Sequence, residues 1–329
     1  MGSATPDTPA TYAVPLRTRF RGLTVREGMV WRGAVGWGEF APFADYDHAA
    51  SVPWLHAAVE AAETGWPAPV RATVPVNCTV PAVGPEAAAT IVRAGHGCRT
   101  AKVKVAERGQ ALADDVARVE AVRDALGPGG RVRIDANGAW DVDAAVVALR
   151  VLDGAAGGLE YAEQPCATVE ELAAVRRRSD VPVAADESIR RAHDPYRVRE
   201  LAAADVAVLK VAPLGGVRAC LGIAERIGLP VVVSSALETS VGLAAGVALA
   251  AALPELPYAC GLGTAALLAR DLAAEPLLPR DGALPVRPAE ADPGLLHAAR
   301  PGTDVVVGWE RRLRAVRAQA GADGQDRQP

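Results

Sequence analysis

RVRIDANGAW, at residues 131–140, reads as a short apolar strand that ends in a carboxylate, Asp135. The pattern recurs in LEYAEQP, where the acid is Glu163, and in VPVAADES, where it is Asp186, at separations of 28 and then 23 residues. A helical stretch precedes each segment, so the acids occupy one position of a repeated β/α unit. In a parallel barrel the carboxyl ends of neighbouring strands meet at one mouth, where three hard oxygen ligands suit Mg²⁺. Any one acid alone is explained as a helix N-cap, but three in successive units predict a metal site.

Lysines lie on the strands that flank the acidic ones. Lys102 and Lys104 are two residues apart in CRTAKVKVA, so both point to the same side of the sheet. Lys210 lies near the end of the strand in DVAVLKVAPLGG. Counting VPVNCTV (residues 74–80) as strand one, these lysines lie on strands two and six, which face each other across an eight-stranded barrel. Two opposed lysines are suited to moving a proton beside a substrate carboxylate, and the charge of Lys102 lowers the pKa of Lys104.

In this order and spacing, the residues resemble the enolase superfamily, in the muconate-lactonizing-enzyme-like subgroup that has a lysine on each side of the site. The motifs that carry the resemblance are Lys102-Val-Lys104, Asp135-Ala-Asn137, Glu163-Gln164-Pro165, Asp186-Glu187-Ser188 and Lys210. Within the subgroup, further segments resemble the enzymes that form 2-succinylbenzoate in menaquinone biosynthesis. These segments are Arg133, DANGAW, SSALETSVG (234–242), TYAVPLRTRFRG (11–22) and GWGEFAPF (36–43). The resemblance covers roughly residues 11–270.

The resemblance implies an α/β fold, a (β/α)8-type (modified TIM) barrel with a small N-terminal α+β capping domain. We expect the cap in residues 1–70, with about the first ten disordered, and the barrel with the active site in residues 71–270. Residues 271–329 should pack back on the cap and end in a frayed tail from Ala318. A cap of about 70 residues is short for this superfamily, so which residues close the site is left open.

The implied reaction is that of a hydro-lyase. It is a metal-dependent syn elimination of water from 2-succinyl-6-hydroxy-2,4-cyclohexadiene-1-carboxylate, through an enediolate, to give 2-succinylbenzoate. Asp135, Glu163 and Asp186 would hold Mg²⁺, for which Mn²⁺ can substitute. Lys104 would take the α-proton and return it to the departing hydroxyl, while Lys210 would stay protonated on the opposite face.

Contacts to the substrate are expected from five residues. Lys102 and Arg133 would orient the carboxylate, and Ser234, Ser235 and Gly263 would contact the succinyl arm. Two neighbouring acids, Glu160 and Glu187, are left out of the ligand set because strand alternation turns them away from the face used by the ligands.

Other functions remain open on the sequence alone. The nearest is an N-succinylamino acid racemase or a dual-function relative, since two opposed lysines also serve proton exchange on either face. A non-catalytic metal-binding barrel would have no use for the lysine pair. A Schiff-base aldolase built on Lys210 would not need three converging carboxylates.

Composition is consistent with a small-molecule enzyme. The 329 residues carry a formal net charge of -4, which gives no reason to expect nucleic acid or an anionic membrane as a partner. The five cysteines form no CxxC or metal spacing, and the N-terminus has no apolar signal core, so we expect a cytoplasmic protein with reduced thiols. We expect a monomer or a weak homo-oligomer.

Hydrophobic periodicity predicts a three-stranded meander, one helical region, a linker, and then about eight strand–helix alternations. The meander is expected at Tyr12–Arg17, Leu23–Arg32 and Val35–Phe40, the helical region at His48–Thr64 and the linker at Pro67–Val70. Barrel helices are expected at Glu86–Ala94, Ala111–Ala125, Val142–Leu152, Val169–Arg178, Pro195–Ala203, Val217–Ile227 and Leu243–Ala252. Strand eight is expected to be short, around Tyr258–Gly263.

Overall fold

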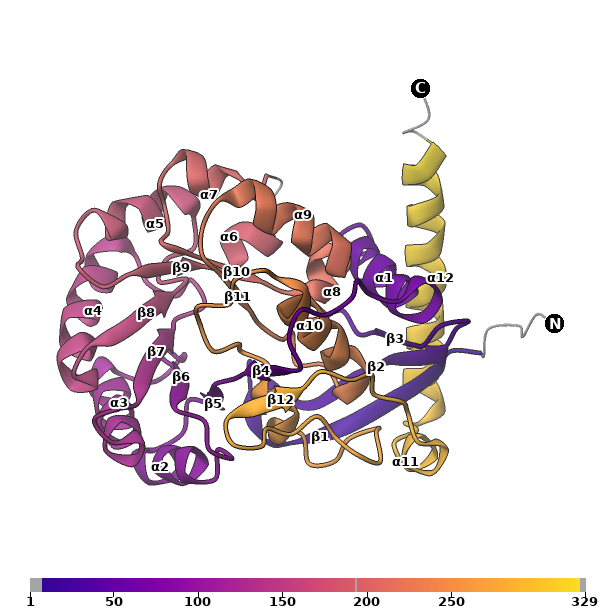
Figure 1. Cartoon of the computed structure of the whole chain (residues 1–329), viewed down its shortest axis with the longest axis horizontal. Coiled ribbons are helices and arrows are strands. Elements are labelled where there is room, and N and C mark those ends of the chain that lie inside the picture. The colour runs from indigo at the N-terminus through magenta and orange to yellow at the C-terminus, as the bar shows by residue number, and fades with distance from the viewer. Residues whose placement is uncertain (1–7, 193, 326–329) are drawn as a thin grey trace.

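The computed structural model describes residues 8–192 and 194–325 (Figure 1). The chain opens with an antiparallel three-stranded meander of β1 (Ala10–Phe20), β2 (Leu23–Arg32) and β3 (Trp37–Phe40). Arg21 and Gly22 connect β1 to β2 with positive φ angles of 52° and 78°. Positive φ at both central residues is the geometry of the tight hairpin turns that match strand twist. The predicted meander is confirmed, and its hairpin turn carries a guanidinium.

Seven parallel strands form the main sheet in the order β11-β10-β9-β8-β7-β6-β5. They are β5 (Cys78–Val80), β6 (Thr100–Lys104), β7 (Arg131–Asp135), β8 (Leu159–Glu163), β9 (Val183–Ala185), β10 (Val206–Leu209) and β11 (Val231–Val233). An eighth segment closes the sheet, because Cys260 bridges Val76 and Gly261 bridges Ser234, both in parallel. The predicted TIM-type barrel is confirmed, although the expected first strand is divided between β4 and β5.

Helices alternate with these strands on the outside of the barrel. They are α2 (Pro85–Arg93), α3 (Leu112–Leu126), α4 (Val142–Ala156), α5 (Val169–Arg176), α6 (Glu187–Arg190), α7 (Arg197–Glu200), α8 (Val211–Leu214), α9 (Val217–Ile227) and α10 (Ser240–Ala252). After the eighth segment the chain makes only a short 3₁₀ helix, η2 (Gly263–Leu267). The outer ring of long helices is therefore interrupted between α10 and α2.

Local sequence explains where several of these helices begin and end. The Asp141 side chain accepts from Ala144 N at the start of α4, and Gly157 ends that helix in the left-handed conformation. Thr168 and Glu171 form a reciprocal capping box at the start of α5. Buried Val, Leu, Ile and Ala side chains from strands and helices fill the space between the two layers. The expected helix at Pro195–Ala203 is reduced to the single turn α7.

The rest of the chain consists of short elements and one long helix. These are α1 (Val52–Val59) with the π-helical turn η1 (Glu60–Thr64), the two-stranded pair of β4 (Thr73–Pro75) and β12 (Ala283–Pro285), α11 (Pro293–Ala298) and α12 (Thr303–Gln325). The expectation of a frayed tail from Ala318 is wrong as far as Gln325, because those residues continue α12, and residues 326–329 lie outside the described part. Of the expected disordered start, residues 1–7 also lie outside it, whereas Ala10 already belongs to β1.

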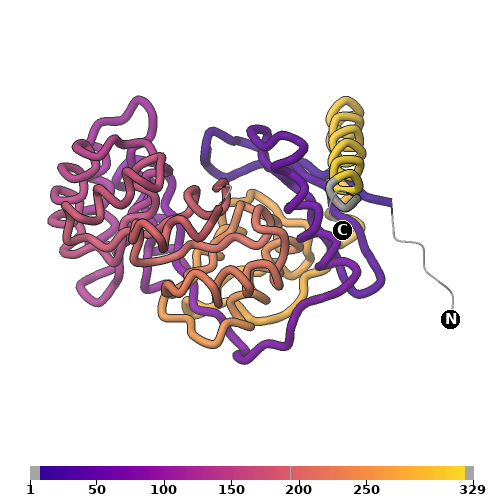
Figure 2. The backbone as a smooth tube through the Cα atoms, turned by 90° about the horizontal axis from the view of Figure 1, so that it is seen from above, coloured from indigo at the N-terminus to yellow at the C-terminus, as the bar shows by residue number. Residues whose placement is uncertain are grey.

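The C-terminal helix α12 returns to the N-terminal meander, and both views show it beside β3 and α1 (Figures 1 and 2). Trp309 packs edge-on against Phe40 with ring centroids 6.2 Å apart, and its Nε1 donates to Glu27 Oε2 at 3.1 Å. Arg312 donates to the carbonyl oxygens of Phe43 and Tyr46 at 2.8 and 2.7 Å. The loop after β3 is therefore held by the far end of the chain.

A buried polar clasp, made of Glu39 and Arg26 from the meander, joins it to the barrel. The Glu39 carboxylate accepts from Tyr12 Oη at 2.7 Å, from Thr239 N and Oγ1, and from Gly242 N at 3.0 Å. Three of these donors lie at the N-terminal end of α10, where a carboxylate compensates free backbone amides. Arg26 Nε donates to Leu237 O at 3.0 Å. The clasp fixes the loop between β11 and α10, which faces the barrel mouth.

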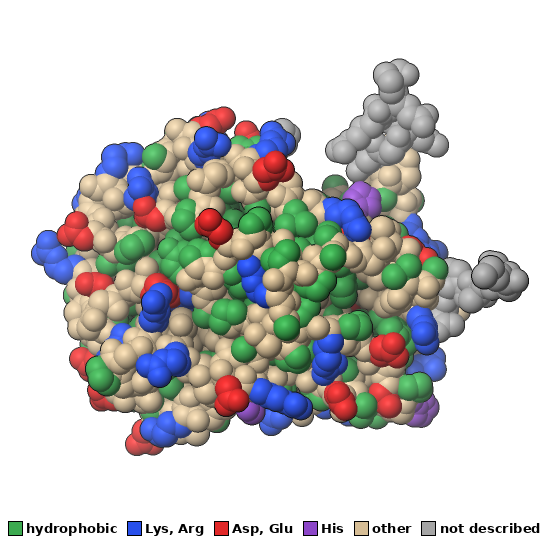
Figure 3. Space-filling view, viewed as in Figure 1, with side chains coloured by type: hydrophobic (Ala, Val, Ile, Leu, Met, Phe, Trp, Pro, Cys, Tyr) green, Lys and Arg blue, Asp and Glu red, His purple; other side chains and the backbone are tan. Residues whose placement is uncertain are grey.

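Acidic and basic side chains are interspersed over the face shown in Figure 3, in keeping with the small net charge. Within residues 8–192 and 194–325, every helix is too short or too polar to cross a bilayer.

Candidate active site

The three predicted acids lie at neighbouring strand ends. Asp135 and Glu163 are the last residues of β7 and β8, and Asp186 directly follows β9. Lys104 is the register partner of Asp135, which in turn pairs with Glu163, so these three residues share one layer of the barrel. Lys210 follows β10. Parallel strand register therefore brings together side chains from positions spread over more than 100 residues of sequence.

Each acid is bound to a lysine in a buried ion pair. Lys102 Nζ contacts both oxygens of Glu163, at 3.0 and 2.9 Å, and lies 3.5 Å from Asp135 Oδ2. Lys104 Nζ contacts Asp135 Oδ2 at 2.5 Å, and Lys210 Nζ contacts Asp186 Oδ2 at 2.6 Å. Because no side chain in these pairs is more than 11% exposed, their charges act through little solvent screening.

The two lysines of strand β6 differ in their acidity. Burial works to lower the pKa of Lys102, but the nearby Glu163 and Asp135 carboxylates outweigh it and raise that pKa, so Lys102 stays a cation. For Lys104, burial lowers the pKa, and the positive charges of Lys102 and Arg21 add to the effect against the attraction of Asp135. Burial likewise lowers the pKa of Lys210, helped by Arg190. A lowered pKa is what a lysine needs to act as a base near neutral pH.

The carboxylates also differ in charge state. Although burial opposes it, the Lys104 and Lys102 ammonium groups hold the pKa of Asp135 well below its usual range, and Lys210 and Arg190 do the same for Asp186. Burial, followed by repulsion from Asp135, raises the pKa of Glu163 to about 7. Three acids are thus close enough to repel one another, which is the condition that a bound cation relieves.

The donor set fits a hard divalent cation in chemistry. Three buried carboxylates offer oxygen ligands only, and two of them, Asp135 and Glu163, already share one positive centre at Lys102 Nζ. As the side chains lie, no group of three or more His, Cys, Asp or Glu residues in the described chain forms a ready metal cage. The physical reason is that the third acid, Asp186, is held instead by Lys210 and by Arg190.

Polar residues that sequence reasoning did not select support the layer. Asn137 Oδ1 accepts from Lys104 Nζ at 2.6 Å, and its Nδ2 donates to Glu187 Oε1 at 3.1 Å. Arg190 Nε donates to Asp186 Oδ1 at 2.8 Å, and its Nη1 reaches the Tyr46 hydroxyl at 2.5 Å. Asn137 lies inside the quoted DAN motif and has a positive φ of 49°, so the motif itself was the available signal.

Strand alternation does not explain the positions of Glu187 and Glu160. Glu187 begins α6 after the strand has ended, so strand alternation does not apply, and its carboxylate contacts Asn137 and lies 3.7 Å from Arg21. Glu160 does lie apart from the carboxylate layer, paired with Arg131 and Arg133.

The expectation that Arg133 orients the substrate carboxylate is wrong for this structure. Arg133 pairs in register with Lys102, one layer deeper in the barrel than Asp135. Its side chain is fully buried, donates to Glu160 and to Ala259 O, and stacks over Tyr161 with 4.6 Å from Cζ to the ring centroid. Arg133 therefore faces the barrel interior, but its own partners hold it below the site, and it does not line the cavity.

The residues proposed for the succinyl arm separate into two groups. Ser234 and Ser235 line the cavity above the lysines, and Ser235 Oγ donates to Glu238 Oε2 and accepts from Thr264 Oγ1, both at 2.7 Å. Gly263 lines a neighbouring crevice instead, and a side chain there would meet Asn77 O. Gly261 and Thr264 line the active-site cavity in its place.

The active-site cavity is small, with a volume of about 20 Å³. That volume holds about one water molecule and no cyclohexadiene. The meander covers it with Phe20, Arg21 and Phe43, and Lys104 Nζ lies 5.5 Å from the Phe20 ring centroid. These are the residues of the short cap that close the site, which sequence alone had left open.

Known proteins match this chain over nearly its full length. Residues 85–299 match the family described as Enolase C-terminal domain-like, and residues 11–62 match Enolase N-terminal domain-like. A relative from Thermobifida fusca (strain YX), called o-succinylbenzoate synthase, is 68% identical over 311 residues, which are 94% of this chain and 96% of that protein. One of the same name from Mycolicibacterium smegmatis is 58% identical, covering 87% of this chain and 88% of its own.

A solved structure supports the fold independently. Muconate lactonizing enzyme from Pseudomonas fluorescens, complexed with muconolactone, superposes with a TM-score of 0.77. The alignment covers 91% of this chain and all of that one, at 23% sequence identity. At this identity the likeness concerns the fold alone.

Proposed function

The chain belongs to the enolase superfamily and, within it, to the o-succinylbenzoate synthases, and from this premise we propose how its residues perform the reaction. The reaction is the dehydration of 2-succinyl-6-hydroxy-2,4-cyclohexadiene-1-carboxylate to 2-succinylbenzoate, a step of menaquinone biosynthesis. It breaks the C–H bond next to the carboxylate and the C–O bond of the ring hydroxyl, so that one water leaves and the ring becomes aromatic.

Lys104 is the base that removes the proton next to the carboxylate. It is the lysine of the β6 pair whose pKa is lowered, and its Nζ points into the cavity between Asp135 and Phe20. Since elimination is syn, the same ammonium then delivers the proton to the departing hydroxyl on the same face of the ring. Asn137, which accepts from Lys104, fixes the direction of its Nζ through both transfers.

Lys210 and Lys102 supply positive charge rather than proton transfer in the elimination. Lys210 approaches the cavity from β10, on the other side from β6, and as an ammonium it stabilises the negative charge that spreads from the carboxylate into the ring. Lys102, whose pKa is raised, remains protonated at the wall of the cavity and balances Glu163.

Asp135, Glu163 and Asp186 would hold a divalent cation, Mg²⁺ with Mn²⁺ able to substitute, in keeping with the general use of Mg²⁺ by enolase-superfamily sites. When bound, the ion supplies Lewis-acid stabilisation of the substrate carboxylate as the proton leaves. Arg190 binds Asp186 Oδ1 while Lys210 binds Oδ2, so both oxygens of that carboxylate are fixed in position.

The succinyl arm is bound by the loop after β11 and by the cap. Ser234 and Ser235 offer hydroxyl groups at the cavity wall, and Arg21 offers a guanidinium above it for the terminal carboxylate of the arm. The clasp of Glu39 and Arg26 holds this loop from behind.

The observation that carries the proposal is the position of Lys104, which lines the cavity beside Asp135, with Lys210 lining the same cavity from the other side. The direct test is conversion of the hydroxylated cyclohexadiene substrate to 2-succinylbenzoate by the purified protein with Mg²⁺. Absence of conversion by a folded, metal-loaded protein would contradict the proposal.

A second activity is favoured by one observation, the position of Lys210 at the same cavity on the other side from Lys104. A lysine of this kind opposite Lys104 is able to exchange a proton from the other face, which is the requirement for racemising N-succinylamino acids. We expect such exchange to be slow or absent, and deuterium incorporation into an N-succinylamino acid measures it. If racemisation is faster than dehydration, racemase is the main activity.

A further inference from the structure

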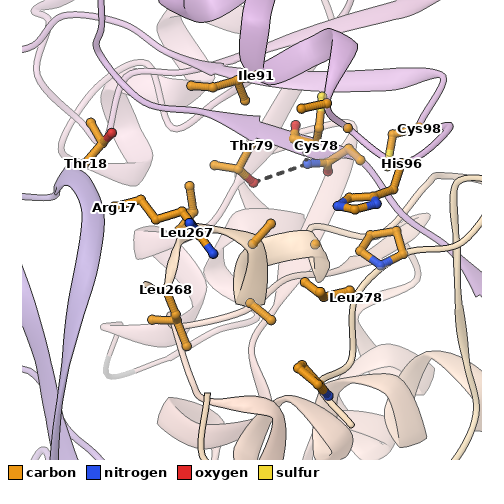
Figure 4. A pocket seen from close by; sticks show the side chains of 18 of the residues that line it. Arg17, Thr18, Cys78, Thr79, Ile91, His96, Cys98, Leu267, Leu268 and Leu278 are labelled. Atoms are coloured by element: carbon orange, nitrogen blue, oxygen red, sulfur yellow. Dashed lines mark hydrogen bonds between the residues drawn. The ribbon is translucent and has the colours of Figure 1, made fainter. Parts of the chain in front are cut away.

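A crevice in the barrel wall lies outside the catalytic cavity. It has a volume of about 400 Å³ and lies between α2, β5, the 3₁₀ helix η2 and the tip of β1 (Figure 4). The space exists because η2 stands where a barrel would place its eighth long helix, which leaves the side of α2 uncovered. Its volume is within the range of small-molecule sites, about 300–1,000 Å³.

The walls of the crevice are aliphatic. Ile91 closes one side, Leu268 and Leu278 the other, and Leu267 lies between them, as Figure 4 shows. Among the described residues that line the crevice, His96 carries the one aromatic ring, and Phe, Tyr and Trp are absent. Such walls favour a flexible hydrocarbon chain over a flat aromatic body.

Two arginines, Arg17 and Arg270, line the crevice and give it a positive charge. Leu16 bridges Leu268, and Ala269 N donates to Pro15 O at 2.8 Å, so the backbones that carry Arg17 and Arg270 are joined. Within residues 8–192 and 194–325 neither guanidinium has a carboxylate partner, and Arg270 has one contact, to Ala298 O at 3.3 Å.

The one carboxylate on the lining is already satisfied. Asp271 accepts from the hydroxyl and backbone amide of Ser240 and from the amides of Leu272 and Ala273. In the described chain it forms no ion pair with either arginine, so both guanidiniums remain available to an anion from outside.

We propose that this crevice is a second ligand site, which binds an aliphatic chain with an anionic end. The aliphatic chain would lie between α2 and η2, and the anionic end would bind Arg17 and Arg270. Carboxylates and phosphates share this chemistry. The site is separate from the catalytic cavity but adjoins it, because Thr79 lines both.

Three ten-carbon probes test the site by titration calorimetry on the full chain, below the concentrations at which they form micelles. They are decanoate, decyl phosphate and decan-1-ol. We expect at least one of the two anions to bind at least about tenfold more tightly than the alcohol, because only an anion engages the guanidiniums. The comparison of decanoate with decyl phosphate identifies the head group. Binding of neither anion, or equal binding of the alcohol, overturns the proposal.

Paired variants locate the binding. Ala94 is exposed at the end of α2 and lines the crevice, so Ala94→Trp fills it without disturbing the core, whereas Ala87→Trp places the same ring on the exposed outer face of α2. Ala94→Trp should weaken anion binding by about tenfold or more, because it occupies the volume, and Ala87→Trp should leave it unchanged. Arg17→Ala should weaken it and Arg19→Ala, two residues along β1 and outside the lining, should not.

A competition experiment separates this site from the active site. Saturating 2-succinylbenzoate, the reaction product, occupies the catalytic cavity and should leave the affinity for the bound anion unchanged. Displacement of the anion by the product, or equal affinity in Ala94→Trp and the wild type, overturns the proposal. The turnover of all four variants, expected to match the wild type, verifies that each is folded.

Discussion

Replacing each opposed lysine by arginine distinguishes the base from the permanent cation. Arginine keeps the positive charge, but it remains protonated at any working pH, so it provides a cation and cannot accept the substrate proton. Lys104→Arg should therefore eliminate proton abstraction, whereas Lys210→Arg keeps what the elimination requires. The two substitutions change charge and size by the same amount, and each side chain faces one carboxylate, Asp135 or Asp186.

The expected magnitudes follow from these roles. Loss of a positioned base costs about 10²–10⁴-fold, so we expect Lys104→Arg to lose about 10³-fold in kcat. This loss corresponds to about 4 kcal/mol of activation free energy. For Lys210→Arg we expect a loss of about tenfold or less, or about 1.4 kcal/mol, because the charge is retained in a less favourable shape. The predicted ratio between the variants is therefore about 100.

The assay follows 2-succinylbenzoate formation at saturating Mg²⁺ and reports kcat and KM separately, with thermal unfolding as the control for folding. In the wild type, kcat/KM should rise with pH, because Lys104 must lose its proton, and this rise should occur below the ordinary lysine pKa, since burial lowers that of Lys104. Equal losses in the two variants, or more than about a tenth of wild-type kcat in Lys104→Arg, would refute the assignment of the base.

Three further outcomes are expected. Excess chelator should abolish turnover and added Mg²⁺ or Mn²⁺ should restore it; full activity in chelator contradicts the metal site. Arg133→Met should lower the free energy of unfolding, measured with urea, by about 3 kcal/mol, because it breaks a buried ion pair with Glu160. It should change KM little. A large change in KM at unchanged stability would show that Arg133 contacts the substrate. Glu39→Ala leaves four hydrogen-bond donors without an acceptor, so it should lower the free energy of unfolding by several kcal/mol, about 1 or more per donor. Glu63→Ala is the control and should have little effect, because Glu63 Oε2 accepts from the Ala34 amide at an exposed position.

The barrel was predictable because its signals are local and repeated. Each strand of the β7, β8 and β9 series is a short apolar run, and capping residues such as Asp141 and Thr168 mark the following helices. The long C-terminal helix α12 was missed, since its apolar positions, Trp309, Leu313 and Val316, are few among many charged residues. That helix depends on burial against the meander, which is a long-range contact that local pattern does not reveal.

In the site, strand order predicted which residues would meet, but not how each side chain would be used. The alternation of side chains along β7 puts Arg133 and Asp135 on the same inward face. Arg133 nevertheless does not reach the cavity, because it lies deeper in the barrel and is bound to Glu160. The alternation rule also stops applying where a strand ends, as at Glu187, which begins α6. The role of Arg21 depends on the hairpin turn folding over the mouth, which involves contacts between distant segments.

The return of α12 to the meander has a consequence for how the molecule is made. Phe43, which covers the cavity, has its carbonyl bound by Arg312, 269 residues later in the chain. At synthesis rates of about 5–20 residues per second, the early strands are complete on the order of 15 to 55 s before that partner exists. The segment that covers the cavity is therefore synthesised well before the residue that binds it.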